Sequence, residues 1–128
     1  MTDFLLDTNL LILTLRGQVS TLQLLDEWNQ QGTLCISVVT RAEIFAGMHP
    51  REKSRTESLL QSLVTLDVDI PVADQAGRWI YTYARKGVQL SFPDALIAAT
   101  AWRHDLVLAT TNTKHFPMPE VQLAHPTL

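Results

Sequence analysis

The sequence has one cysteine, a slight shortage of basic residues and no long apolar run. Cys35 is the only cysteine, so no disulfide can form within the chain, which suits a reducing compartment. The formal net charge of −3 argues against holding nucleic acid by bulk positive charge. Every apolar run is far shorter than a membrane span, and no basic leader or cleavage site opens the chain. We therefore expect a cytoplasmic protein without a membrane segment.

The composition is that of an ordinary globular protein. Hydrophobic residues make up 46% of the 128 residues and charged residues 18%, a balance that excludes a disordered chain. A chain of this length is sufficient for one hydrophobic core. We expect a single domain over residues 1–128.

Short apolar segments alternate with segments of helical periodicity along the whole chain. An unbroken apolar run, typical of a strand buried on both faces, precedes Asp7. Further strands are expected over residues 34–39, 66–70, 106–109 and 121–123, with the strand over 66–70 near the sheet edge. This alternation predicts a three-layer α/β/α domain with a mostly parallel central sheet.

Three capping-box patterns predict where helices begin. Ser20 is followed three residues later by Gln23, Thr40 by Glu43, and Ser91 by Asp94. The segment after Asp94 is apolar almost all round and rich in alanine, so we expect a helix packed closely against the sheet. Two further helices are expected, over residues 8–15 and from residue 72 to about Gly87.

Acidic and amide side chains follow several of the predicted strands. Asp7 ends the first strand, Glu43 lies near the start of a helix, and Asn112 follows the strand over 106–109. The carboxyl ends of parallel strands meet at one edge of a sheet, so these side chains should converge there. Spacing alone places Asp94 less securely. Each carboxylate could instead serve as a helix cap worth about 0.3–1 kcal/mol.

Carboxylates that lie close together repel one another, whereas separate helix caps do not. Without a cation the carboxylates repel one another, which should raise the pKa of at least one of them. Hard oxygen ligands of this kind are those that Mg²⁺ or Mn²⁺ requires. Such an ion would let an acidic protein act on a phosphodiester. The residues alone leave two readings open, metal-dependent phosphoryl chemistry and a structural α/β module.

Four segments together resemble the PIN domain, and within it the VapC-type toxins of toxin–antitoxin pairs. They occur in family order along nearly the whole chain: Leu5-Leu6-Asp7-Thr8-Asn9, the segment 37–44 containing Thr40-Arg41-Ala42-Glu43, the segment 94–101 beginning Asp94-Ala95-Leu96, and the segment 109–116 containing Thr110-Thr111-Asn112. The resemblance implies a Mg²⁺-dependent endoribonuclease, with Mn²⁺ as a substitute. It further implies an RNA substrate, a cognate antitoxin protein and a homodimer.

The resemblance also assigns roles to individual residues. It maps the metal ligands to Asp7, Glu43 and Asp94, and the family's fourth polar position to Asn112, where many members carry Asp. An amide supplies no charge, so Asn112 is expected to contact a metal-bound water or the scissile phosphate.

Other side chains are weaker candidates for the same site. Hydrogen bonds that orient the metal ligands are expected from Thr8, Asn9 and Thr111, and phosphate contacts from Arg41, Arg85, Lys86 and Lys114. His115, close to Asn112 in sequence, is the one histidine with a functional case. The polar helix over 50–63 is a candidate docking surface for the antitoxin.

Several other classes of protein also have an α/β fold with acids at strand ends. A receiver-type phospho-acceptor domain would need an acidic pair after the first strand, and a haloacid-dehalogenase-like phosphatase would need Asp at the place of Asn9. A non-catalytic partner-binding module does not need the acidic set. A stand-alone PIN nuclease of RNA processing or repair is the main alternative, and the identity of the RNA stays open.

Overall fold

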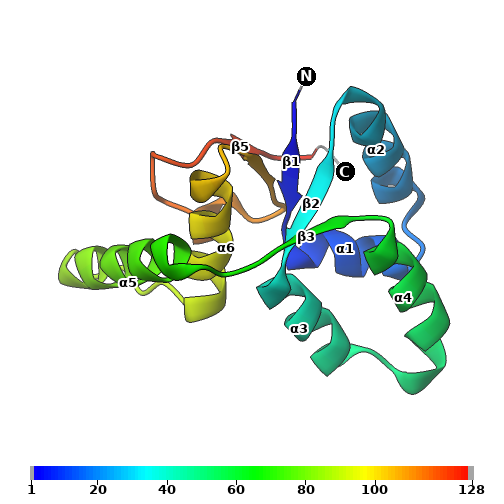
Figure 1. Ribbon diagram of the computed structural model, residues 1–128, viewed down its shortest axis with the longest axis horizontal. Coiled ribbons are helices and arrows are strands. Elements are labelled where there is room, and N and C mark those ends of the chain that lie inside the picture. The colour runs from blue at the N-terminus through cyan, green and yellow to red at the C-terminus, as the bar shows by residue number, and fades with distance from the viewer. Residues whose placement is uncertain (1, 127–128) are drawn as a thin grey trace.

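The computed structural model describes residues 2–126 and places a five-stranded parallel sheet between two layers of helices (Figure 1). The strands are β1 (Phe4–Leu6), β2 (Leu34–Ser37), β3 (Val64–Leu66), β4 (Val107–Ala109) and β5 (Leu123–Ala124). Their order across the sheet is β3-β2-β1-β4-β5, with β1 in the centre and β3 at an edge. The prediction of a three-layer α/β/α fold with a parallel sheet is confirmed.

Alternate residues of the strands face opposite layers. Leu5, Cys35 and Leu108 pack with α5 (Ile70–Arg85) and α6 (Phe92–Arg103). Leu6 and Ile36 face the other layer. That layer consists of α1 (Thr8–Leu15), α2 (Val19–Gln31), α3 (Val38–Gly47) and α4 (Lys53–Gln61). Two short 3-10 helices, η1 (Pro50–Glu52) and η2 (Thr113–His115), complete the chain.

Helix α6 lies against the sheet through its alanines, as its sequence predicts. Ala95, Ala98 and Ala99 are fully buried, and Ser91 Oγ accepts a hydrogen bond from the backbone N–H of Asp94 at 3.2 Å. Ser91 is therefore the N-cap that the sequence indicates, with Asp94 as the third residue of the helix.

The other two predicted capping boxes are wrong. Helix α2 begins at Val19, so Ser20 lies inside it. Helix α3 begins at Val38 directly after β2, and its cap is Ser37, whose Oγ accepts from the backbone N–H of Val39 at 3.0 Å. Thr40 is thus an interior residue. The β-branched pair after Ser37 favours a strand locally, but tertiary packing places it in a helix.

The edge strand also differs from its predicted range. It ends at Leu66 and does not continue through residue 70, because Asp69 caps α5 by accepting from the backbone N–H of Val72 at 3.0 Å. Asp69, inside the expected strand, is therefore the start of a helix. Within residues 2–126, none of the helices is long and apolar enough to cross a lipid bilayer.

Gly32 marks a close approach of two backbone segments. A Cβ built there would clash with the carbonyl oxygen of Thr2, whereas a Cβ at Gly77, inside α5, would meet nothing within 4 Å. We expect Gly32→Ala to lower the free energy of unfolding by about 1–3 kcal/mol through overpacking. Gly77→Ala should raise it by about 0.5–1 kcal/mol through helix propensity. Urea denaturation measures both, and equal stability of the two variants would contradict the packing at Gly32.

Candidate active site

Asp7 stands at the carboxyl end of the central strand and is almost fully buried, with 5% of its surface exposed. Its backbone N–H donates to the carbonyl of Ala109 on β4 at 2.9 Å. Its Oδ1 accepts from the backbone N–H of Thr8 at 2.8 Å, which caps α1, and its Oδ2 accepts from Thr110 Oγ1 at 2.8 Å. Asp7 is therefore both a helix cap and a buried carboxylate at the sheet edge where ligands bind.

Burial raises the pKa of Asp7 above its ordinary value, and the charges of Asp94 and Glu43 raise it further. The hydrogen bonds from Thr110 and Thr8 act in the opposite direction without cancelling the rise. The pKa of Asp7 is thus raised in the expected direction, but burial, and not the expected repulsion between the acids, is the largest cause. The three acids thus share one electrostatic environment although they come from distant parts of the chain.

Glu43 is the sixth residue of α3, not the third as the capping box predicts. Its Oε1 lies 2.7 Å from Thr8 Oγ1, which in turn lies 3.1 Å from the hydroxyl of buried Thr40. A carboxylate can only accept, so the hydroxyl of Thr8 donates to Glu43 and accepts from Thr40. These two threonines hold Glu43 beside the start of α1.

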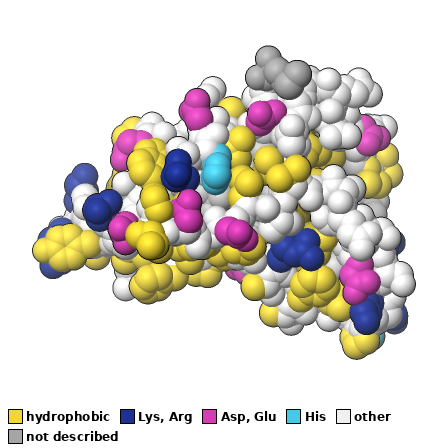
Figure 2. Space-filling model, in the orientation of Figure 1, with side chains coloured by type: hydrophobic (Ala, Val, Ile, Leu, Met, Phe, Trp, Pro, Cys, Tyr) yellow, Lys and Arg dark blue, Asp and Glu magenta, His cyan; other side chains and the backbone are white. Residues whose placement is uncertain are grey.

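Asp94 and Asn112 meet at a third side chain. Asp94 lies in the first turn of α6, and its Oδ2 is 3.4 Å from His115 Nδ1. Asn112 follows β4; its backbone N–H donates to Thr110 Oγ1 at 3.0 Å and its Nδ2 lies 3.0 Å from His115 Nε2. Figure 2 shows a histidine and acidic side chains close together near the middle of one face of the molecule.

The acids are near one another but do not form a ready-made metal site. Among residues 2–126, no three His, Cys, Asp or Glu side chains are close enough together to hold one ion as they stand. Glu43 turns to Thr8, and Asp94 faces His115. Like charges that lack a cation favour such separation. The donor set itself consists of oxygen atoms, which fits a hard divalent cation.

Of the three residues expected to support the acids, one does so, and two threonines that the sequence did not indicate take part as well. Thr8 does bond to an acid, whereas Asn9 is exposed and Thr111 only half-buried. Instead, fully buried Thr110 bonds to Asp7, and fully buried Thr40 supports Thr8. A polar residue directly after an apolar strand was the signal that could have identified Thr110.

The predicted phosphate contacts lie on several elements. The guanidinium of Arg41 is 3.4 Å from Thr65 Oγ1 and 5.9 Å from the ring of Phe45. Arg85 stacks on Tyr81 at 3.8 Å at the end of α5, while Lys86 and Lys114 are exposed. Arg41 lies on α3, the helix that also carries Glu43.

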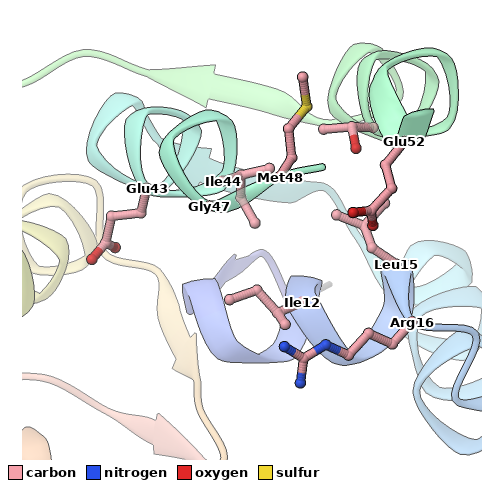
Figure 3. Close-up of a pocket in the computed structure, with 9 residues that line it drawn as sticks. Ile12, Leu15, Arg16, Glu43, Ile44, Gly47, Met48 and Glu52 are labelled. Carbon is pink, nitrogen blue, oxygen red and sulfur yellow. The ribbon is translucent and has the colours of Figure 1, made fainter. Parts of the chain in front are cut away.

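A hollow of about 120 Å³ opens beside Glu43, between α1 and the segment from α3 to α4 (Figure 3). Ile12, Ile44 and Met48 form its apolar wall, and Arg16 lies on its rim (Figure 3). The buried hydroxyl of Thr56 also lines it and has no hydrogen-bond partner among the described residues. Glu43 also lines the hollow, with its carboxylate directed away from Ile12 and Met48, so the hollow adjoins an acid of the site (Figure 3).

Known proteins resemble this chain over nearly its whole length. The family model described as PIN domain matches residues 4–119. A protein named Ribonuclease VapC10, from Mycobacterium tuberculosis, is 40% identical over 116 residues, which cover 91% of this chain and 87% of the relative. A protein named tRNA(fMet)-specific endonuclease VapC, from Shigella flexneri, is 31% identical over 122 residues, 91% of each chain.

A solved structure has the same fold. It is described as a toxin–antitoxin complex from Klebsiella pneumoniae and superposes with a TM-score of 0.80 at 30% identity, covering 96% of this chain and 97% of that one. Fold, family model and sequence identity agree. The chain belongs to the PIN domain family, among its VapC ribonucleases.

Proposed function

We propose that the chain is a metal-dependent endoribonuclease, the toxin of a toxin–antitoxin pair, and that Asp7, Glu43 and Asp94 form its active site. The observation that carries this proposal is the grouping of Glu43 and Asp94, from separate segments, near the buried carboxylate of Asp7, whose pKa is raised mainly by burial and further by their charges. A parallel sheet needs no such group for its stability, and at neutral pH a bound cation would remove the cost of the mutual repulsion. The relatives named as ribonuclease and endonuclease support the same reaction.

Mg²⁺, with Mn²⁺ as a substitute, matches the oxygen donors of the site. Asp7 and Asp94 would hold it directly, and Glu43 directly or through water. Each oxygen of Asp7 accepts one hydrogen bond from the protein and keeps a further lone pair. When bound, such an ion activates water and neutralises charge on the phosphodiester.

The remaining chemistry belongs to the side chains themselves. Thr8 donates to Oε1 of Glu43, which leaves Oε2 to accept a proton from the attacking water. Thr110 and the backbone N–H of Thr8 fix the two oxygens of Asp7. Asn112 has no charge to offer, and we assign its amide to the scissile phosphate. A homodimer, which the family resemblance implies, stays a prediction.

The antitoxin would bind at the hollow beside α3. Its apolar wall fits an apolar side chain of a partner segment, and Arg16 and Glu52 on its rim fit polar flanks. The solved relative described as a toxin–antitoxin complex supports a protein partner of this kind. Thr56 in α4 lies in the helix over 50–63 that the sequence analysis singled out. A segment seated there would lie against α3, which carries Glu43, and so limit access of RNA.

We expect Asp7→Asn and Asp94→Asn to lose RNA cleavage by about 100-fold or more, because each removes a charged ligand. Asn112→Ala should cost less. The matched control is Asp105→Asn, which changes an exposed carboxylate beyond the other end of α6. An asparagine tolerates the positive φ of 53° at that position. The measurement is Mg²⁺-dependent cleavage of RNA, and full activity of Asp7→Asn would contradict the proposed site.

The raised pKa of Asp7 makes stability depend on pH and metal. A carboxyl whose folded pKa is raised stabilises the fold below its unfolded pKa of about 4, and this contribution is lost as pH rises through the folded value. At neutral pH without metal, Asp7→Asn should therefore be more stable than wild type by roughly 1 kcal/mol.

Millimolar Mg²⁺ should raise the melting temperature of the wild type and have little effect on Asp7→Asn, because the ion binds only the native site. Thermal melts of both proteins, from pH 4 to 8 and with or without the ion, measure this. A less stable variant together with no metal shift in either protein would leave Asp7 as a helix cap only.

We expect Met48→Glu to weaken antitoxin binding by about tenfold or more, because it places a charge in the apolar wall of the hollow. RNA cleavage by the chain alone should stay unchanged. Val88→Glu, on the exposed connection between α5 and α6, is the control. Binding is measured by calorimetry with the antitoxin encoded beside the gene. Wild-type affinity in Met48→Glu would place the partner elsewhere.

A further inference from the structure

His115 lies between two side chains of the site that come from different elements. Its Nδ1 is 3.4 Å from Asp94 Oδ2, at the start of α6, and its Nε2 is 3.0 Å from Asn112 Nδ2, beyond β4. The histidine side chain is half exposed, so it is not there to fill the core. The next residue, Phe116, is only 2% exposed, so it anchors the end of η2 in the core.

The partners determine where the imidazole carries its proton. The amide nitrogen of Asn112 can only donate, so Nε2 of a neutral ring accepts from it. The ring proton is then on Nδ1, where it faces the Asp94 oxygen, which can only accept. The ring thereby lies between the amide, from which its Nε2 accepts, and the carboxylate, which its Nδ1 faces at 3.4 Å.

The structure assigns to His115 the role of a positioning residue: it orients the carboxylate of Asp94 toward the metal and the amide of Asn112 toward the substrate. This inference rests on the proposed metal-dependent function. It addresses a difference between the two aspartates of the site. Both carboxylate oxygens of Asp7 accept hydrogen bonds. In Asp94, by contrast, it is the backbone N–H that donates to Ser91 Oγ, so this bond does not hold the carboxylate.

His115 supplies that support to Asp94. With Oδ2 facing the ring, the other oxygen of Asp94 is left for the ion. Outer partners that orient a ligating side chain in this way change metal affinity by about 10- to 100-fold when they are removed.

Three substitutions separate the two contacts. His115→Asn places a donor near the position of Nδ1 and gives up the contact with Asn112. His115→Gln reaches the position of Nε2 and gives up the donor to Asp94. His115→Ala loses both. His104→Gln, at the exposed far end of α6, is the control.

Affinity for Mn²⁺ is measured by calorimetry on the full chain, with no RNA present. We expect about tenfold weaker binding in His115→Ala and His115→Gln, and affinity within about threefold of wild type in His115→Asn and in the control. Under saturating Mn²⁺, His115→Asn should still lower kcat, because Asn112 has lost its partner. Equal affinity in all the variants overturns the role.

A second readout uses no metal. In the wild type, nitrogen NMR of the neutral form of the His115 ring should find its proton on Nδ1 and not on Nε2. A ring protonated on Nε2 overturns the inference even if the variants bind Mn²⁺ weakly. Absence of Mn²⁺ binding in the wild type, or unchanged binding in Asp94→Asn, contradicts the metal proposal itself and removes the basis for this role.

Discussion

The site depends on one carboxylate buried at the end of the central strand. The backbone of Asp7 extends the sheet by bonding to Ala109, and its Oδ1 starts α1. Because β1 pairs with β2 on one side and β4 on the other, the ends of its neighbours are brought to the same edge. A charge in this position is unfavourable by itself. The surrounding hydroxyl and amide donors lower that cost, and the nearby acids raise it again.

Each acid of the group has its own support from neighbouring polar groups. Thr110 bonds to Asp7, the pair Thr40 and Thr8 supports Glu43, and the imidazole lies against Asp94. These contacts keep the carboxylates apart while holding them at one edge of the sheet. Because each carboxylate has its own partner, the repulsion between the acids is limited when no cation is bound.

The parts of the fold with strong local signals could be predicted from the sequence. The apolar run before Asp7 predicts where the first strand ends, and the cap at Ser91 predicts where α6 begins. The positions of Asp7 and Asp94 follow from these two boundaries. Glu43 was assigned to the right helix in the wrong register, because the true cap, Ser37, is hidden at the end of a strand. The contact from Thr110 to Asp7 spans 103 residues of sequence, and no local pattern encodes such a pairing.

The direct passage from β2 into α3 fixes the rotation of the helix relative to the strand. Ser37 is the last residue of the strand and the cap of the helix, so no loop lies between them. One inserted residue would turn α3 by about 100° and carry Glu43 away from Thr8. Because Glu43 also lines the hollow, the same insertion would alter the wall of the hollow and the acid group together.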